Sequence, residues 1–394
     1  MRSSDESTNH KLNMNHTMKS RFHPIALTAC FAATLLSAAA ESAEDQRTPP
    51  KGAVYTMDNA GGANHVWAFT RAANGALGTP TIVATGGAGT GTALGNQGAI
   101  QLSRDGHWLV VCNAGSDELS VFYVTDQGLT LTDKVSSQGR QPISITLHDD
   151  LLYVLNAGGE AGGADSIAGF VLAYGHLFPL PGATSGLSGP NTGPAEVAFT
   201  QDGSTLVVTE KGTGLIDTFL VGDDGVAEGA KMFSSPAPPP YGFAAGRDNR
   251  IFVTQAAGGG GNPGASSVSS YQVQDDGSLR TISDSVATHQ TAACWLVLTS
   301  DQRFAYAANT PNDSLSSFSV VPNGKLQLLQ SRAALPGTGS HPGEMGLSAN
   351  NRFLYALDGN GTISAFSVNL FNGSLQATSS TTGLPTTVNG MAVR

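Results

Sequence analysis

The sequence is poor in charged, aromatic and cysteine residues. Of its 394 residues, 13% are charged, 7% are aromatic and three are cysteines. The formal net charge is −10, which argues against nucleic acid or an anionic membrane surface as a partner. There is no G-x-S-x-G motif for a serine nucleophile, and no glycine-rich loop has phosphate-binding spacing followed by a helix. No stretch predicts a convincing helix, so the chain is expected to consist of strands and turns.

The first forty residues predict an export signal. Met18 to Arg21 forms a basic start, Ile25 to Leu36 is an apolar run, and Ala38 to Ala40 offers a small-residue cleavage site. The run is too short to span a membrane, so we expect a secreted or periplasmic protein without membrane insertion. Translation from Met18 fits this pattern. Cleavage after residue 40 removes four basic and two acidic residues, which changes the net charge from −10 to −12.

Two shorter features flank the cleavage site. The sequence Leu27-Thr28-Ala29-Cys30 resembles a lipoprotein box, but the residues that follow Cys30 are apolar where a lipoprotein has polar ones. Lipidation at Cys30 therefore stays an alternative to simple cleavage. Residues 41–51 are polar and contain proline, and we predict a disordered lead-in.

The remainder, residues 52–394, repeats one unit. The unit is clearest at Thr192–Val221, where an apolar strand, a turn containing Asp202-Gly203, a second strand at Thr205–Thr209 and a third strand follow one another. A fourth strand follows the turn at Asp223-Asp224-Gly225. Asp-Gly between two β-rich runs is a strong hairpin signal. Four short antiparallel strands per unit are typical of a β-propeller blade.

Seven such units align, with second strands spaced 43 to 55 residues apart, within the range of propeller repeats. The equivalent second-strand residues are Tyr55, Val110, Tyr153, Val207, Phe252, Tyr306 and Tyr355. The first unit lacks its first strand, which is found at the other end of the chain in Asn389–Val393. We therefore predict an all-β fold, a single seven-bladed β-propeller over residues 52–394, closed by the C-terminal strand.

The composition and repeat pattern also bear on cysteine chemistry and assembly. Cys112 and Cys294 are placed in strands of distant blades, among apolar residues. We predict two buried thiols, with a disulfide as the alternative, because small hydrophobic thiols are commonly buried. No oligomer-forming helix or exposed hydrophobic stripe is evident, so we expect a monomer.

Polar residues gather where the predicted strands meet the channel mouth. The start of each inner strand and the end of each second strand lie at the same edge of an antiparallel blade. The second strands end on Asp58, Asn113, Asn156, Glu210, Gln255, Asn309 and Asp358. The inner strands begin near Gln97, Arg140, Glu196, His289, His341 and Glu344. Together with Lys211, these groups are predicted to form a concave site.

A structural role for the same residues stays open. Asn and Asp after a strand often cap turns through their own backbone, and Trp295 is predicted to be a packing residue. The carboxylates and histidines, by contrast, are usually placed in water or paired when they are not functional.

The repeat itself resembles a known family. The pattern x-L-S-x-D-G-x-x-L-Y-V-x-N-x-G-x-x-x-I-S-x-F, present around Ser103–Phe122 and Ser348–Phe366, resembles the lactonase family of seven-bladed propellers. That family includes 6-phosphogluconolactonases and carboxymuconate cyclases and is similar to the YVTN-repeat proteins. The resemblance covers essentially the whole mature chain and is closest to an exported branch in which TGPA, VVTEK and QTAACW recur. It implies opening or closure of a lactone ring on a small-molecule substrate.

The family's site residues are only partly present. Glu210 matches the family glutamate, whereas Ala195 and Glu196 stand where the family has Arg and His. Pro142-Ile143 replaces a Pro-His pair, and Thr254-Gln255-Ala256 lacks the expected Arg. These departures leave the activity open although they do not affect the predicted fold.

Three functions follow as hypotheses. The first is metal-free general acid/base catalysis without a cofactor, with Glu210 or Glu196 as base and His289 beside them. In it, substrate is bound by Arg140, Lys211, Gln97, Asn113, Asn156, His341 and Glu344. The second is a gluconolactonase-like hydrolase with a divalent cation on Asn113, Asn156, Glu210 and Asp358. The third is a non-catalytic propeller that binds a ligand or a partner protein, since fold does not decide function.

Overall fold

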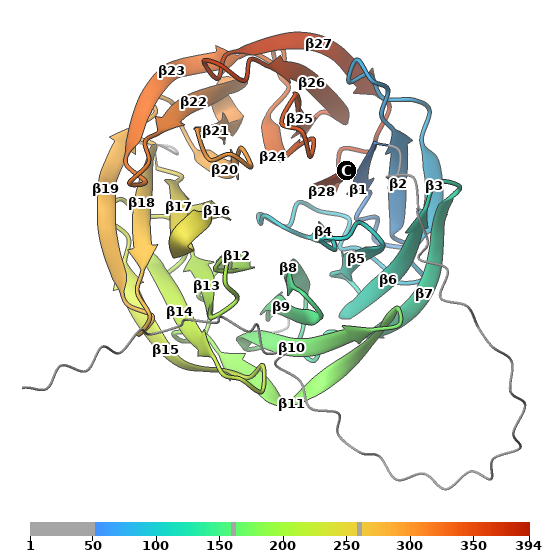
Figure 1. Ribbon diagram of the computed structural model, residues 1–394. Helices are drawn as coiled ribbons and strands as arrows, with labels where there is room; N and C mark the ends of the chain where they lie inside the picture. The colour runs from blue at the N-terminus through green and yellow to red at the C-terminus, as the bar shows by residue number, and fades with distance from the viewer. Residues whose placement is uncertain (1–51, 159–162, 258–261) are drawn as a thin grey trace, which may run out of the picture. The chain divides into compact units, whose positions relative to one another are not determined.

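The computed structural model describes residues 52–158, 163–257 and 262–394. The predicted signal peptide, the alternative start at Met18, Cys30 and the lead-in lie outside the described residues. The described chain forms seven four-stranded antiparallel sheets arranged in a ring (Figure 1), which confirms the predicted seven-bladed propeller. Within these residues, the helical elements are the 3-10 turns η1 (Arg247–Asn249) and η2 (Thr310–Asn312). In the same ranges, no helix is long and apolar enough to cross a membrane.

We number the blades in chain order. Within each blade, the four strands are called inner, second, third and outer in order of increasing distance from the channel. The inner strands of blades 1 to 7 are β28 (Asn389–Val393), β4 (Ile100–Leu102), β8 (Pro142–His148), β12 (Pro194–Phe199), β16 (Pro240–Ala245), β20 (Ala293–Leu298) and β24 (Pro342–Leu347). The second strands are β1 (Ala53–Met57), β5 (Trp108–Asn113), β9 (Leu151–Ala157), β13 (Thr205–Glu210), β17 (Arg250–Gln255), β21 (Phe304–Asn309) and β25 (Phe353–Asp358). The third strands are β2 (His65–Thr70), β6 (Glu118–Thr125), β10 (Asp165–Ala173), β14 (Leu215–Val221), β18 (Ser267–Val273), β22 (Ser314–Val320) and β26 (Thr362–Val368). The outer strands are β3 (Thr81–Ala84), β7 (Gly128–Ser136), β11 (His176–Gly186), β15 (Ala227–Ser234), β19 (Leu279–Ala287), β23 (Leu326–Ala334) and β27 (Leu375–Thr382).

The C-terminal strand closes the ring as predicted. Strand β28 pairs antiparallel with β1, and Tyr55 lies opposite Ala392. The Arg394 amide donates to the Ala53 carbonyl at 2.8 Å. The Arg71 guanidinium donates to the Arg394 carbonyl at 3.1 Å. Residues more than 300 positions apart thus form the inner half of blade 1, and a propeller without them has an open edge.

Blades are tied to one another by hydrogen bonds as well as by apolar packing. Four second-strand tyrosines are buried, and three of their hydroxyls donate to a glycine carbonyl in the outer hairpin of the next blade. The pairs are Tyr153 with Gly225 at 2.8 Å, Tyr306 with Gly373 at 2.9 Å, and Tyr355 with Gly75 at 2.7 Å. Because a buried hydroxyl without a partner is costly, these bonds favour one docking register between neighbouring blades.

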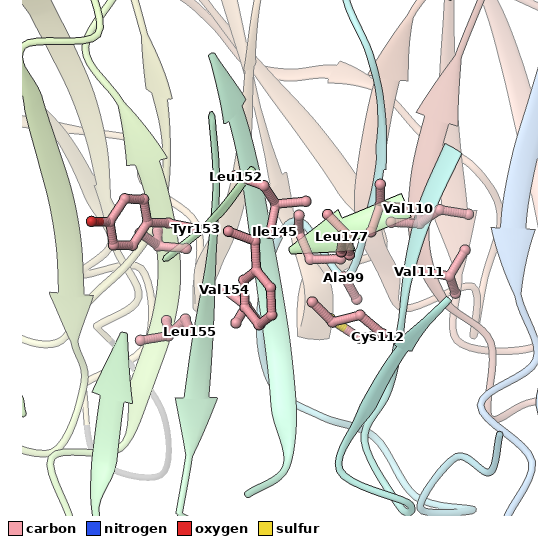
Figure 2. Close-up of a cluster of buried hydrophobic side chains, with 14 of the residues drawn as sticks. Ala99, Val110, Val111, Cys112, Ile145, Leu152, Tyr153, Val154, Leu155 and Leu177 are labelled. Carbon is pink, nitrogen blue, oxygen red and sulfur yellow. The ribbon is translucent and has the colours of Figure 1, made fainter. Parts of the chain in front are cut away.

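The apolar faces of adjacent blades supply most of the core. Figure 2 shows the boundary between blades 2 and 3, where Val110 and Cys112 of β5 lie near Ile145 of β8 and Leu152 of β9. Cys112 and Cys294 are both buried and both free thiols. The interpretation of the two cysteines as buried thiols is therefore confirmed.

Candidate active site in the channel

The inner strand of blade 2 is much shorter than the others. Strand β4 has three residues, and the trace that leads into it extends toward the middle of the ring (Figure 1). The Gln97 amide donates to the Ala195 carbonyl of blade 4 at 3.0 Å, and the Ile145 amide of blade 3 donates to the Gly98 carbonyl at 2.8 Å. We name residues 95–98 the channel segment, because they cross the channel rather than extend the sheet.

The side chain of Gln97 contacts blades 4, 5 and 6. Its Nε2 atom lies 3.2 Å from Glu196 Oε1, 3.0 Å from the Phe243 carbonyl and 3.1 Å from the Leu296 carbonyl. Its Oε1 atom accepts a hydrogen bond of 3.0 Å from the Leu296 amide. A Cβ atom at Gly242 would lie 2.2 Å from Gln97 Oε1, so the absence of a side chain there makes room for the carboxamide.

The rest of the channel segment is held just as closely. The Asn96 carbonyl accepts from the indole N–H of Trp295 at 2.7 Å, and the Asn96 side-chain amide donates to the Ile143 carbonyl. The Gly95 carbonyl accepts from Lys211 Nζ. Together with the Gly98 amide, which donates to Glu344, the four residues contact blades 3, 4, 5, 6 and 7.

Two buried carboxyl groups flank the channel segment. Glu196 and Glu344 are each 6% exposed. Glu196 Oε2 accepts from the Phe243 amide at 2.5 Å, and Glu344 Oε1 accepts from the Gly98 amide at 2.8 Å. Two buried carboxyl groups from blades 4 and 7 therefore both bond to the channel segment, one through the Gln97 side chain and one through the Gly98 amide.

Burial and mutual repulsion shift the proton affinity of this pair. Burial raises the pKa of Glu344 to about 7, although neighbouring backbone amides oppose part of the effect. Burial also raises the pKa of Glu196 well above its usual range; the Phe243 amide opposes this rise and the Glu344 charge adds to it. Both carboxyl groups therefore hold their protons more tightly than a glutamate in water does, and a charge on Glu344 raises the pKa of Glu196 further.

A cationic and aromatic wall lies beside the channel segment. Lys211 Nζ lies 4.9 Å from the centroid of the Tyr241 ring, and that ring is 5.4 Å from the Trp295 ring. Burial lowers the pKa of Lys211 to about 8. A partly desolvated ammonium group of this kind binds a carboxylate more strongly than one in water does. The structure thus gives Trp295 a polar contact in the channel in addition to the predicted packing role.

Glu210 occupies a different environment from Glu196. It is fully buried, and its carboxylate accepts from the Ser188 amide at 3.0 Å, the Ser188 hydroxyl at 2.5 Å and the Thr213 hydroxyl at 2.5 Å. Burial, a hydrogen bond with Glu210 and the Glu210 charge raise the pKa of Asp217 to about 8. Glu210 and Asp217 form a second carboxyl pair within blade 4. No contact in the described part of the chain joins this pair to Glu196.

The other residues at the ends of the second strands are bonded locally. Asn113 Oδ1 accepts from the Thr85 hydroxyl at 2.7 Å, Asn156 Nδ2 donates to the Ser137 carbonyl at 3.2 Å, and Asp358 accepts from the Ser364 hydroxyl at 2.6 Å. With Glu210, these were the predicted ligands of a divalent cation. They are engaged separately, and the described residues contain no group of three or more His, Cys, Asp or Glu side chains arranged to hold a metal ion. This donor set does not fit such a cation.

Three predicted site residues lie on exposed positions around the mouth. Arg140, His289 and His341 are all exposed. His341 Nδ1 is 3.7 Å from Asp313 Oδ1. Arg140 lies beside Gly163, and His289 lies beside Gly264. Of the ten predicted site residues, Gln97, Glu196, Lys211 and Glu344 are brought together by the channel segment.

Backbone groups of the site had no signal in the sequence. The Phe243 carbonyl and the Leu296 amide and carbonyl bond to Gln97, and the Phe243 amide bonds to Glu196. The pairing register shifts beside these groups, between Pro240 and Phe243 and between Ala293 and Trp295. Such β-bulges redirect backbone groups next to functional sites. Nothing in residue type alone marks their positions.

Comparison with known proteins identifies the family. The structure resembles the periplasmic gluconolactonase PpgL of Pseudomonas aeruginosa with a TM-score of 0.68, 17% identity and coverage of 87% of this chain and 98% of that one. It also resembles a candidate 6-phosphogluconolactonase from Bacteroides fragilis with a TM-score of 0.62, 19% identity and coverage of 89% and 100%. No curated protein matches the chain. The sequence matches the family described as Lactonase, 7-bladed beta-propeller, over residues 49–162 and 264–390, and the chain therefore belongs to that family.

Proposed function

We propose that this chain is an exported lactonase that hydrolyses a small lactone in its channel without a metal ion. Family membership supports a lactonase-like function. Export is supported by the signal-like N-terminus and by the periplasmic location of the similar gluconolactonase PpgL. The observation that carries the proposal is the Glu196 and Glu344 pair, two buried carboxyl groups with raised pKa values that both bond to the channel segment.

The pair fits the chemistry of lactone hydrolysis. The Glu344 carboxylate takes a proton from water, and the water oxygen forms a bond to the lactone carbonyl carbon. The resulting oxyanion is stabilised by backbone N–H groups such as that of Leu296. The ring C–O bond then breaks, and the acid form of Glu196 gives its proton to the leaving oxygen. One lactone and one water become one hydroxy acid, and the reverse sequence closes the ring.

This assignment differs from the simplest hypothesis for Glu196. Sequence alone favoured Glu196 or Glu210 as base. We assign Glu344 as base and Glu196 as acid because the Glu344 charge adds to the effect of burial in raising the pKa of Glu196. Within the described residues, Glu210 makes no hydrogen bond to the channel segment, and its carboxylate accepts hydrogen bonds from Ser188 and Thr213 instead. Lys211 is placed to hold a carboxylate on the substrate or product.

A binding function without catalysis is the second candidate. It is favoured by the burial of the candidate site, because Glu196 and Glu344 are each only 6% exposed. A propeller in this state binds partners on its surface rather than substrates in its channel.

The test is turnover of a lactone panel by the mature protein from Glu41, with and without chelator. Gluconolactone, muconolactone, homoserine lactones and dihydrocoumarin cover acidic and neutral substrates and both alkoxide and phenoxide leaving groups. We expect chelator-resistant hydrolysis that falls at least 100-fold in Glu196→Gln and in Glu344→Gln, and less than threefold in Glu210→Gln at a temperature where that variant is folded. Chelator-sensitive turnover contradicts the metal-free mechanism, and no turnover of any lactone favours the binding function.

A further inference from the structure

The surroundings of the Gln97 carboxamide resemble a binding site for a planar acyl group. Its oxygen receives a backbone N–H from Leu296 at 3.0 Å, as a carbonyl does in an oxyanion hole. Its nitrogen lies 3.2 Å from Glu196 Oε1. An amide and an ester share the same planar C(=O)–X arrangement, in which X is nitrogen or oxygen.

From this arrangement we infer that Gln97 is an internal substrate mimic, whose carboxamide occupies the site of the reacting lactone group and must withdraw before catalysis. The inference rests on the proposed lactonase function and concerns the regulation of the same site. It also predicts the ligand class that the emptied site accepts, namely small neutral carboxamides and lactones.

The correspondence extends to each atom of the ester. The lactone carbonyl oxygen replaces Gln97 Oε1 at the Leu296 amide, and the ring oxygen replaces Nε2 next to Glu196. Glu196 there gives a proton to the oxygen that leaves. The carbonyls of Phe243 and Leu296, 3.0 and 3.1 Å from Nε2, then accept the hydroxyl that forms on ring opening. Every polar partner of the Gln97 carboxamide thus has a role toward substrate or product.

The channel segment has the features of a part that moves as a unit. Gly95 and Gly98 at its two ends have φ values of +63° and +87°, which glycine adopts without strain. Lys211 donates a hydrogen bond to the Gly95 carbonyl, and Trp295 donates one to the Asn96 carbonyl. A substrate carboxylate that draws Lys211 away from Gly95 releases one of these two bonds. Binding of an acidic lactone and opening of the channel are thereby coupled.

The experiment removes the Gln97 carboxamide and tests whether a free amide binds in its place. Mature wild type, Gln97→Ala and the smaller-change variant Gln97→Ser are compared with Gln290→Ala, which removes a glutamine bonded to Ser331 outside the channel. Acetamide is the probe, and the readouts are its effect on thermal unfolding and the kcat/KM for lactones. We expect acetamide to raise the melting temperature of the Gln97 variants by at least 2 °C, with no effect on wild type or Gln290→Ala. We expect kcat/KM of the Gln97 variants to rise at least fivefold, and acetamide to inhibit them competitively.

The outcomes separate this inference from the proposed function. Acetamide stabilisation of the Gln97 variants without lactone turnover in any protein supports the acyl-group site and overturns the lactonase proposal. Glu196-dependent turnover combined with no acetamide effect on either folded Gln97 variant overturns the mimic and leaves the lactonase proposal standing. A fall in kcat/KM in both Gln97 variants also overturns the inference that Gln97 is a substrate mimic, because Gln97 then assists catalysis instead of blocking the site.

Discussion

The carboxyl pair of blade 4 makes a sharp prediction about stability and pH. Asp217 is buried, and its own oxygens accept no hydrogen bond from the described residues. In its acid form it donates to Glu210, and its pKa is raised to about 8 from an ordinary value of 3.8. The folded protein therefore binds more protons than the unfolded chain between these pH values. Stability must fall as the pH rises through this window and level off above about pH 8.

The magnitude follows from the same two pKa values. A difference of about four pH units corresponds to roughly 5 kcal/mol if nothing relaxes. Water entry and local movement reduce this value, so we expect a loss of about 2 to 5 kcal/mol between pH 4 and pH 9 from this residue. Asp217→Asn keeps a donor toward Glu210 and has no proton to lose, so it should remove that loss.

Urea unfolding of the mature protein at several pH values measures the effect. Asp223→Asn, in the exposed turn of the same blade, makes the same charge change and is the matched control. The Asp217→Asn variant should be more stable than wild type at pH 9 by about 2 to 5 kcal/mol and nearly equal to it at pH 4. Equal pH dependence of unfolding in wild type and Asp217→Asn would refute the claim that Asp217 holds a proton that it donates to Glu210.

Two further predictions concern closure of the ring. Tyr355→Phe leaves the Gly75 carbonyl without its partner between blades 7 and 1, so the free energy of unfolding should fall by about 1 to 2 kcal/mol in urea titrations; a change below 0.3 kcal/mol would show that this bond contributes little. Removal of Asn389–Arg394 takes the inner strand from blade 1 and exposes the edge of β1, so circular dichroism and size-exclusion chromatography should show an unfolded or aggregated protein at temperatures where the full ring is native. A folded, monomeric truncated protein contradicts the account of closure.

Sequence reasoning succeeded where a local pattern repeats. The repeated strand pattern, with turns such as Asp105-Gly106 and Asp202-Gly203, defined the seven blades, and the incomplete first unit predicted the pairing of β28 with β1. Turn chemistry and hydrophobic alternation are properties of neighbouring residues, so the sequence displays them directly.

The site was harder because it depends on how blades dock. Glu196 and Glu210 were both expected at the channel mouth. Glu196 pairs with Thr209, and consecutive side chains in a strand point to opposite faces, so Glu210 faces away from Glu196 and toward Ser188. Gln97 was recognised only as one residue of the mouth. Its contacts with Glu196 and Leu296 span 99 and 199 positions in the chain, and they depend on a segment that leaves its sheet. No local pattern encodes such a crossing.

The pH dependence of lactone hydrolysis tests the central claim most directly. If Glu344 is the base, kcat/KM of the mature protein rises with pH through about 7, where its carboxyl group loses the proton, and falls at higher pH as Glu196 ionises. Glu344→Gln should lack the rising limb and retain less than 1% of the wild-type maximum. A rising limb that persists unchanged in Glu344→Gln contradicts the assignment of the channel pair as the catalytic acid and base.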